Sequence, residues 1–323
     1  MKIFKILLAN ILLVFIVLFV FEFYVYKTEL KAGSDYFPFL YPYYTHNLNK
    51  KWDDTYVKIL KNEVKEIESG FRRTKIDESI DLNKSGILLF GCSFAYGAQL
   101  EDNETLSYYL SKYSKRPVYN RAFSGWGIQG MLYQLNLPDF IASLKYNITP
   151  DSTIEPDYNN IDYVIYVFIG DHARRQLIPC CYFDNKFLFY NQDKNKENLI
   201  RKGELSNLYW HSYILRKSYR NRISNIFYDD KSVDLFYRHL KASGDKIKEL
   251  FPQAKFTVLA FDGNDFMKKV EDKLNDENIS ILYLSDLSDI DFYSGEYVIP
   301  DFEHPTGKSW DVISKLLIEK LNL

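Results

Sequence analysis

The feature that most constrains the fold is a repeated alternation of short apolar runs with longer amphipathic segments after position 85. Predicted strands fall at 87–90, 117–122, 163–169, 255–261 and 279–284, and predicted helices include 128–135, 232–250 and 306–321. Strands that alternate with helices along a chain form a parallel sheet covered by helices. We therefore expect an α/β fold with a mostly parallel five-stranded sheet.

The first predicted strand ends at a serine that lies between two glycines. The apolar run Ile87–Phe90 predicts a buried strand, and the residues Gly91-Cys-Ser-Phe-Ala-Tyr-Gly97 lead from it toward a helix start at Asp102–Thr105. In open parallel sheets, ligands bind at the carboxyl ends of the strands. Ser93 is therefore a candidate nucleophile. A tight strand-to-helix turn in which Ser93 only caps the helix is the structural alternative.

Three more predicted strands or loops end in residues that could act with this serine. They are Gly125 within Asn120–Gly127, the run Gly170-Asp171-His172, and Asp301-Phe-Glu-His304-Pro305 before the last helix. Acyl transfer by a serine needs a base, a carboxylate that orients the base, and N–H donors for the oxyanion. His304 can supply the base and Asp301 the carboxylate.

These blocks resemble, in order and spacing, those of the SGNH (GDSL-like) hydrolases. Gly91-Cys-Ser-Phe with Gly97 is similar to their serine block, Asn120–Gly127 to their second block, and Asp301-x-x-His304 to their last. The resemblance implies a flavodoxin-like three-layer α/β/α domain over 85–323. It also implies a triad of Ser93, His304 and Asp301, an oxyanion hole formed by the N–H groups of Ser93 and Gly125, and no metal or cofactor.

The third block departs from this family. Where the family has an asparagine that donates to the oxyanion, this chain has His172, followed closely by Arg174 and Arg175. The resemblance therefore leaves His172 as a candidate third donor. A salt-bridged loop over 171–175 explains the same residues without a role in the site.

Outside this domain, the sequence predicts a membrane anchor and two further segments. Residues 1–27 contain an apolar run of roughly 20 residues, which is long enough to cross a bilayer, and Lys2 and Lys5 precede it. No small-residue cleavage site follows, so we expect an uncleaved signal anchor with a cytoplasmic N-terminus and a periplasmic or extracellular catalytic domain. Residues 28–84 form a connector that includes an amphipathic helix at 53–67, and about 174–232 form an insertion.

Composition narrows the function classes further. The net charge is −2, which argues against a nucleic-acid partner. The three cysteines, Cys92, Cys180 and Cys181, fit neither a metal site nor a disulfide framework and are interpreted as free thiols.

The sequence thus predicts a serine esterase. The resemblance together with the anchor favours an O-acetyl ester of a cell-envelope glycan, or another small ester, as the substrate. Two alternatives stay open. The same triad could transfer acetyl groups to a polysaccharide, or the scaffold could be a non-catalytic glycan-binding or assembly protein. The oligomeric state is not predicted.

Overall fold

The computed structural model describes residues 72–76, 79–123, 125–148, 156–175, 230–274, 278–299 and 304–323, with a few positions between 10 and 20. All the strands and helices named below belong to one compact unit, which comprises residues 54–201 and 228–323. A second unit comprises residues 1–53 and 202–227. The predicted helix at 53–67 and most of the predicted insertion at 174–232 lie outside the described residues.

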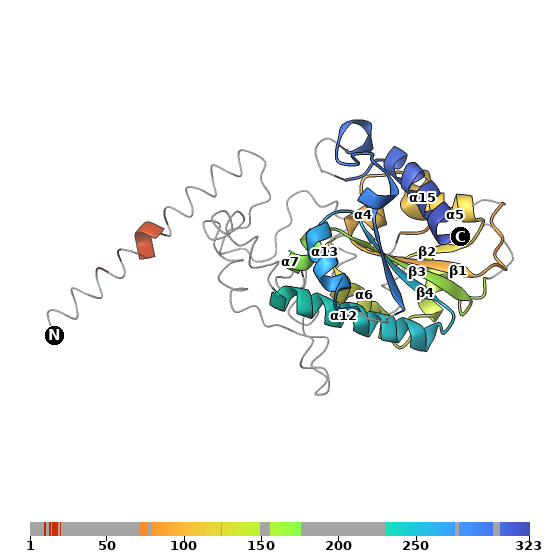
Figure 1. The fold of residues 1–323 in the computed structure, drawn as a ribbon, viewed down its shortest axis with the longest axis horizontal. Helices are drawn as coiled ribbons and strands as arrows, with labels where there is room; N and C mark the ends of the chain where they lie inside the picture. The colour runs from red at the N-terminus through yellow and green to blue at the C-terminus, as the bar shows by residue number, and fades with distance from the viewer. Residues whose placement is uncertain are drawn as a thin grey trace. The chain divides into compact units, whose positions relative to one another are not determined.

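The centre of the larger unit is a five-stranded parallel sheet (Figure 1). Its strands are β1 (Gly86–Phe90), β2 (Val118–Asn120), β3 (Ile161–Phe168), β4 (Lys255–Ala260) and β5 (Ile279–Tyr283), in the spatial order β2-β1-β3-β4-β5. Every neighbouring pair is parallel. This is the flavodoxin-like strand order. Successive strands are added on one side of β1 as far as β2 and then on its other side from β3 onward, so the order of addition reverses between β1 and β3. The predicted α/β class and five-stranded parallel sheet are confirmed.

Helices cover both faces of this sheet, as Figure 1 shows. On one face lie α6 (Ile128–Leu135), α12 (Asp230–Leu250) and α13 (Asn264–Glu271), and on the other lie α5 (Leu106–Ser114) and α15 (Gly307–Leu321). Shorter helices are α4 (Ser93–Tyr96), α7 (Asp171–Arg175) and α14 (Leu284–Leu287), with 3₁₀ turns at Asp102–Glu104, Ala142–Asn147 and Gly295–Tyr297.

The strand β3 shows how the sequence builds two cores at once. Val164, Tyr166 and Phe168 pack against α6, α12 and α13, whereas Ile165 and Val167 face α5 and α15. Successive side chains of a strand point to opposite faces, so a central strand that is covered on both sides must be apolar throughout. This explains why the sequence shows a continuous apolar run here rather than an alternating one.

The strand β2 is shorter than the predicted range of 117–122. The Asn120 side chain accepts a hydrogen bond from the Ala122 N–H at 3.1 Å, which turns the chain out of the ladder. Two backbone hydrogen bonds still tie this segment to β1, from Arg121 N–H to Leu89 C=O at 2.7 Å and from Phe123 N–H to Gly91 C=O at 3.1 Å. The segment that follows β2 therefore leaves the sheet beside the turn that follows β1.

In the second unit, the described positions between 10 and 20 are helical and exposed. Among the described residues, no helix is both long enough and apolar enough to span a membrane.

Candidate active site

Ser93 is the first residue of α4, directly after the turn that ends β1. Gly91 makes this turn possible, because its φ is +147° and a Cβ there would lie 2.9 Å from the Ala95 Cβ and 3.1 Å from the Val167 carbonyl oxygen. An L side chain would be strained at that φ and crowded at those distances. Ser93 itself is 8% exposed, so its hydroxyl lies at the edge of the sheet with little of it open to solvent.

The structure brings His304 to this serine from the other end of the domain. The Nε2 atom of His304 lies 2.8 Å from the Oγ atom of Ser93, a hydrogen-bond distance. His304 directly precedes Pro305, which forms a short antiparallel bridge with Val298, and the backbone C=O of His304 accepts from the Ile299 N–H at 2.8 Å. The predicted carboxylate partner, Asp301, lies outside the described residues.

The predicted oxyanion donor Gly125 lies in a tight turn beside Ser93. The Trp126 N–H bonds to the Phe123 C=O at 3.1 Å, and Gly125 has a φ of +81° at the third position of this turn. Glycine is the residue that adopts this backbone conformation without strain. Within the described part of the chain, neither the Ser93 N–H nor the Gly125 N–H has a hydrogen-bond acceptor.

His172 lies in the core beneath this edge of the sheet. Its ring is fully buried, its Nδ1 atom lies 2.6 Å from the Tyr166 hydroxyl, and its ring packs edge-on against Phe168 at a centroid distance of 5.6 Å. Burial, together with the charge of Arg175, holds the pKa of His172 well below its usual range, so the ring is neutral. Its Nε2 atom exposes less than 1 Å² and has no partner among the described residues. A role as third oxyanion donor stays a prediction, because a substrate oxygen would have to enter this buried space.

Asp171, the neighbour of His172, forms the ion pair that the structural alternative predicts. Its carboxylate accepts from the Arg175 Nε at 2.7 Å, one turn along α7. Arg175 also donates from Nη1 to the Trp126 carbonyl oxygen at 3.1 Å. The sequence placed Arg175 near the site without assigning it a contact. The available signal was a cation one helical turn after an acid at a strand end.

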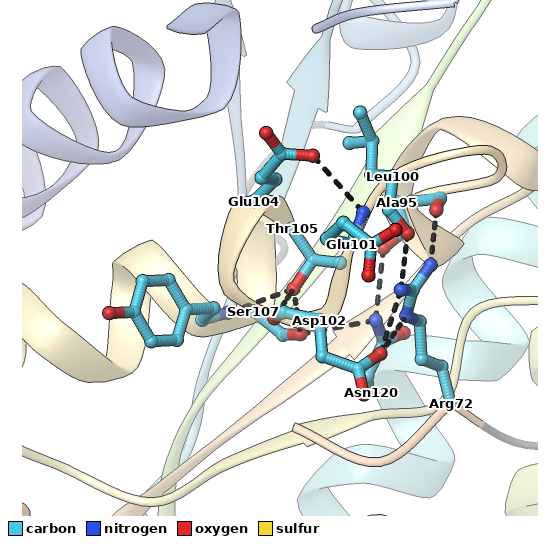
Figure 2. A network of polar contacts seen from close by, with 11 residues as sticks. Arg72, Ala95, Leu100, Glu101, Asp102, Glu104, Thr105, Ser107 and Asn120 are labelled. Carbon is cyan, nitrogen blue, oxygen red and sulfur yellow. Dashed lines mark hydrogen bonds and ion pairs between the residues drawn. The ribbon is translucent and has the colours of Figure 1, made fainter. Parts of the chain in front are cut away.

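A polar network surrounds Ala95 in α4 and the loop that follows this helix (Figure 2). The Asn120 side chain donates to the Ala95 carbonyl oxygen in α4 at 3.1 Å and to the Ser107 hydroxyl in α5 at 3.3 Å. Arg72 donates to the carbonyl oxygens of Gly97 and Leu100, the latter at 2.5 Å. These bonds tie the C-terminal end of α4, and the loop that follows it, to neighbouring elements.

The thiol of Cys92, immediately before Ser93, is buried. Burial raises its pKa, while the nearby Arg175 guanidinium and a hydrogen bond from the Phe94 backbone act in the opposite direction. A neutral thiol of this kind behaves as a small apolar side chain, so Cys92 is a packing residue here rather than a second nucleophile.

No protein-family model matches the chain, and no curated protein does. Among solved structures, a carbohydrate esterase described as having divergent catalytic and non-catalytic binding functions is 14% identical over 76% of this chain and 69% of its own, with a TM-score of 0.42. A structure assigned to the G-D-S-L family from Desulfitobacterium hafniense is 11% identical over 73% and 99%, with a TM-score of 0.40. A lipase from a goat rumen metagenome is 11% identical over 73% and 97%, with a TM-score of 0.47. At this level of similarity, the chemistry has to be argued from the site itself.

Proposed function

We propose that the chain is a serine esterase that hydrolyses a carboxylic ester. The observation that carries the proposal is the hydrogen-bond distance of 2.8 Å between Ser93 Oγ and His304 Nε2. A serine hydroxyl is a weak nucleophile by itself, and an adjacent imidazole that accepts its proton is the usual means of activating it. Both side chains lie at the carboxyl edge of a parallel sheet, next to the strand-order reversal where such sheets bind ligands.

In the proposed reaction, Ser93 Oγ attacks the ester carbonyl while His304 Nε2 takes the hydroxyl proton. The N–H groups of Ser93 and Gly125 donate to the oxyanion that forms, with His172 as a candidate third donor. His304 then returns the proton to the leaving alcohol, and an acyl-Ser93 remains. Water, deprotonated by His304, attacks this acyl group, and His304 then returns the proton to Ser93 Oγ as the acyl–oxygen bond breaks and the acid leaves. Asp301 orients His304 and stabilises its charged form.

The proposed substrate is an O-acetyl ester of a cell-envelope glycan. This follows from the resemblance to SGNH hydrolases and from the proposed anchor, residues 1–27, which would hold the catalytic domain (85–323) outside the cytoplasm. The anchor is supported by six apolar side chains that are 51–65% exposed in the N-terminal segment rather than packed in a core, namely Leu13, Phe15, Ile16, Val17, Leu18 and Val20. Exposed apolar side chains of this number are unfavourable in water and favourable in a bilayer.

The test is hydrolysis of a chromogenic acetyl ester by the full chain in detergent. We expect Ser93→Ala to lower kcat by about 10³-fold or more, because the covalent intermediate can no longer form. The matched control is Ser114→Ala. Ser114 is as buried as Ser93, at 6% exposure, but lies in α5, where its hydroxyl bonds only within its own helix. Activity that survives Ser93→Ala unchanged, or falls equally in Ser114→Ala, would contradict the proposal.

A further inference from the structure

We infer that Arg175 is a positioning residue for the proposed reaction, one that holds the turn carrying Gly125 against the turn carrying Ser93. The inference rests on the proposed esterase function and adds to it a residue that does not touch the substrate. Arg175 ends α7, the short helix after β3, while the two turns follow β2 and β1. It is therefore placed to join three neighbouring strand ends of the sheet.

The guanidinium binds residues at the ends of β3 and β2, and the end of β2 is joined to the end of β1. Nε donates to the Asp171 carboxylate at 2.7 Å, and Nη1 donates to the Trp126 carbonyl oxygen at 3.1 Å, one residue after Gly125. The Gly125 turn is itself joined to the Ser93 turn by the backbone, because the Phe123 N–H donates to the Gly91 carbonyl oxygen at 3.1 Å. Only 11% of the Arg175 side chain is exposed, so these bonds are shielded from competing water.

The backbone of Arg175 adds a second connection to the Gly125 turn. The Gln129 side chain, in the first turn of α6, donates to the Arg175 carbonyl oxygen at 2.6 Å. Gly127, between the turn and α6, has no side chain, and a Cβ there would lie 3.5 Å from the Arg175 Cβ. The segment from Trp126 to Gln129 is thus held against α7 through both the side chain and the backbone of one residue.

A positioning role follows from what the oxyanion geometry demands. Ser93 and Gly125 donate from different turns, so the two N–H groups face one oxygen only if the turns keep a fixed separation. A displacement of about 1 Å at such a site can cost on the order of 100-fold in rate. A planar guanidinium donates in several fixed directions at once, whereas the ammonium of a lysine is a single point on a flexible stem.

The experiment compares Arg175→Ala and Arg175→Lys with a matched control, Arg116→Ala, in the full chain. Arg116 is a similarly shielded arginine, 19% exposed, paired with Asp162 at the opposite, amino end of the strands. Two quantities are measured: the kinetic constants for a chromogenic acetyl ester, and amide hydrogen exchange over residues 123–129. We expect Arg175→Ala to lower kcat by about 100-fold with KM within about threefold, and to speed exchange over 123–129 at least about tenfold. For Arg175→Lys, both kcat and the exchange rate over 123–129 should lie between the values for Arg175→Ala and for the unchanged chain.

A role in general stability would give a different pattern. If Arg175→Ala and Arg116→Ala lower kcat equally, or if exchange over 123–129 stays unchanged in Arg175→Ala, the inference is wrong while the proposed esterase function stands. If the unchanged chain shows no ester hydrolysis that depends on Ser93, the proposed function fails and the inference fails with it. In that case, faster amide exchange over 123–129 in Arg175→Ala would show only that Arg175 stabilises this turn.

Discussion

Ser93 and His304 are 211 positions apart in the chain, and an aromatic ring packs against the imidazole beside the serine. The Phe94 ring lies 5.1 Å from the His304 ring between centroids, and the Phe261 ring packs edge-on against Phe94 at 5.2 Å. These rings come from the ends of β1 and β4, the same edge of the sheet that presents the serine. Residues that the sequence shows only as apolar therefore shape the proposed catalytic pair.

A buried histidine in α12, a helix that contributes no residue to the proposed site, makes the stability of this domain dependent on pH. His239 in α12 is 3% exposed, and burial lowers its pKa to about 4, below its usual value of 6.5. As the pH falls below about 6.5, His239 becomes protonated in the unfolded chain but stays neutral in the folded chain. The stability due to neutral His239 is fully present above that value and is lost toward pH 4.

We expect this group alone to lower the free energy of unfolding by about 2 kcal/mol between pH 7 and pH 5. The measurement is urea unfolding at both pH values for the unchanged chain and for His239→Gln. The quantity compared is the difference between the two pH values, because the substitution itself changes absolute stability. A difference that is as large in His239→Gln as in the unchanged chain would assign the pH dependence to other groups, such as His172.

At the scale of elements, the turns after the strands decide where the functional atoms lie. Gly91 and Gly125 both have positive φ, and each lies in the turn that positions one of the two proposed oxyanion donors. The sequence predicted these turns well, because glycine next to an apolar run is a strong local signal. The end of β2 was predicted less well, because the Asn120 side chain competes with the ladder for a backbone N–H.

The Gly91 turn gives a sharp test of this dependence. We expect Gly91→Ala to lower the free energy of unfolding by about 2 to 5 kcal/mol, because the new methyl group combines backbone strain with crowding against Ala95 and Val167. Gly295→Ala is the matched control. Gly295 also has a positive φ, of +56°, but a Cβ there meets no atom within 4 Å. It should cost only about 1 kcal/mol.

Both variants are compared by urea unfolding and by ester hydrolysis. We expect Gly91→Ala to hydrolyse the ester more slowly than the unchanged chain even at a temperature where the variant is still folded. Equal effects of the two substitutions would mean that backbone strain alone, and not the close packing of the Ser93 turn, governs this region.

At the scale of the whole molecule, two features were predictable from the sequence: the layered fold, and the approach of His304 to Ser93. Strand and helix periodicity gives a parallel α/β fold, and in such a fold residues at strand ends share one edge. The burial of His172 was not predictable, because it depends on Tyr166 and Phe168 from a strand whose side chains alternate between two cores. The contact of Arg175 with the Trp126 carbonyl oxygen likewise arises only from tertiary packing.

The proposed anchor would determine which substrates the domain can reach in a cell. The alternative reaction uses the same proposed triad but passes an acetyl group to a glycan hydroxyl instead of to water. Glycan acetylation in a deletion strain separates the two reactions. The proposed esterase predicts that acetylation rises when the gene is removed. Acetylation that falls would instead identify a transferase.

The most direct test of the central claim is to identify the covalent intermediate. The full chain is mixed with an activated acetyl ester, quenched in acid within milliseconds, digested and analysed by mass spectrometry, alongside His304→Ala. We expect an acetyl group on Ser93 in the unchanged chain, formed on the order of 10³-fold more slowly in His304→Ala. Two results would contradict the proposed mechanism. One is steady ester hydrolysis with no acetyl group on Ser93 even when deacylation is slowed, and the other is acetylation of Ser93 in His304→Ala as fast as in the unchanged chain.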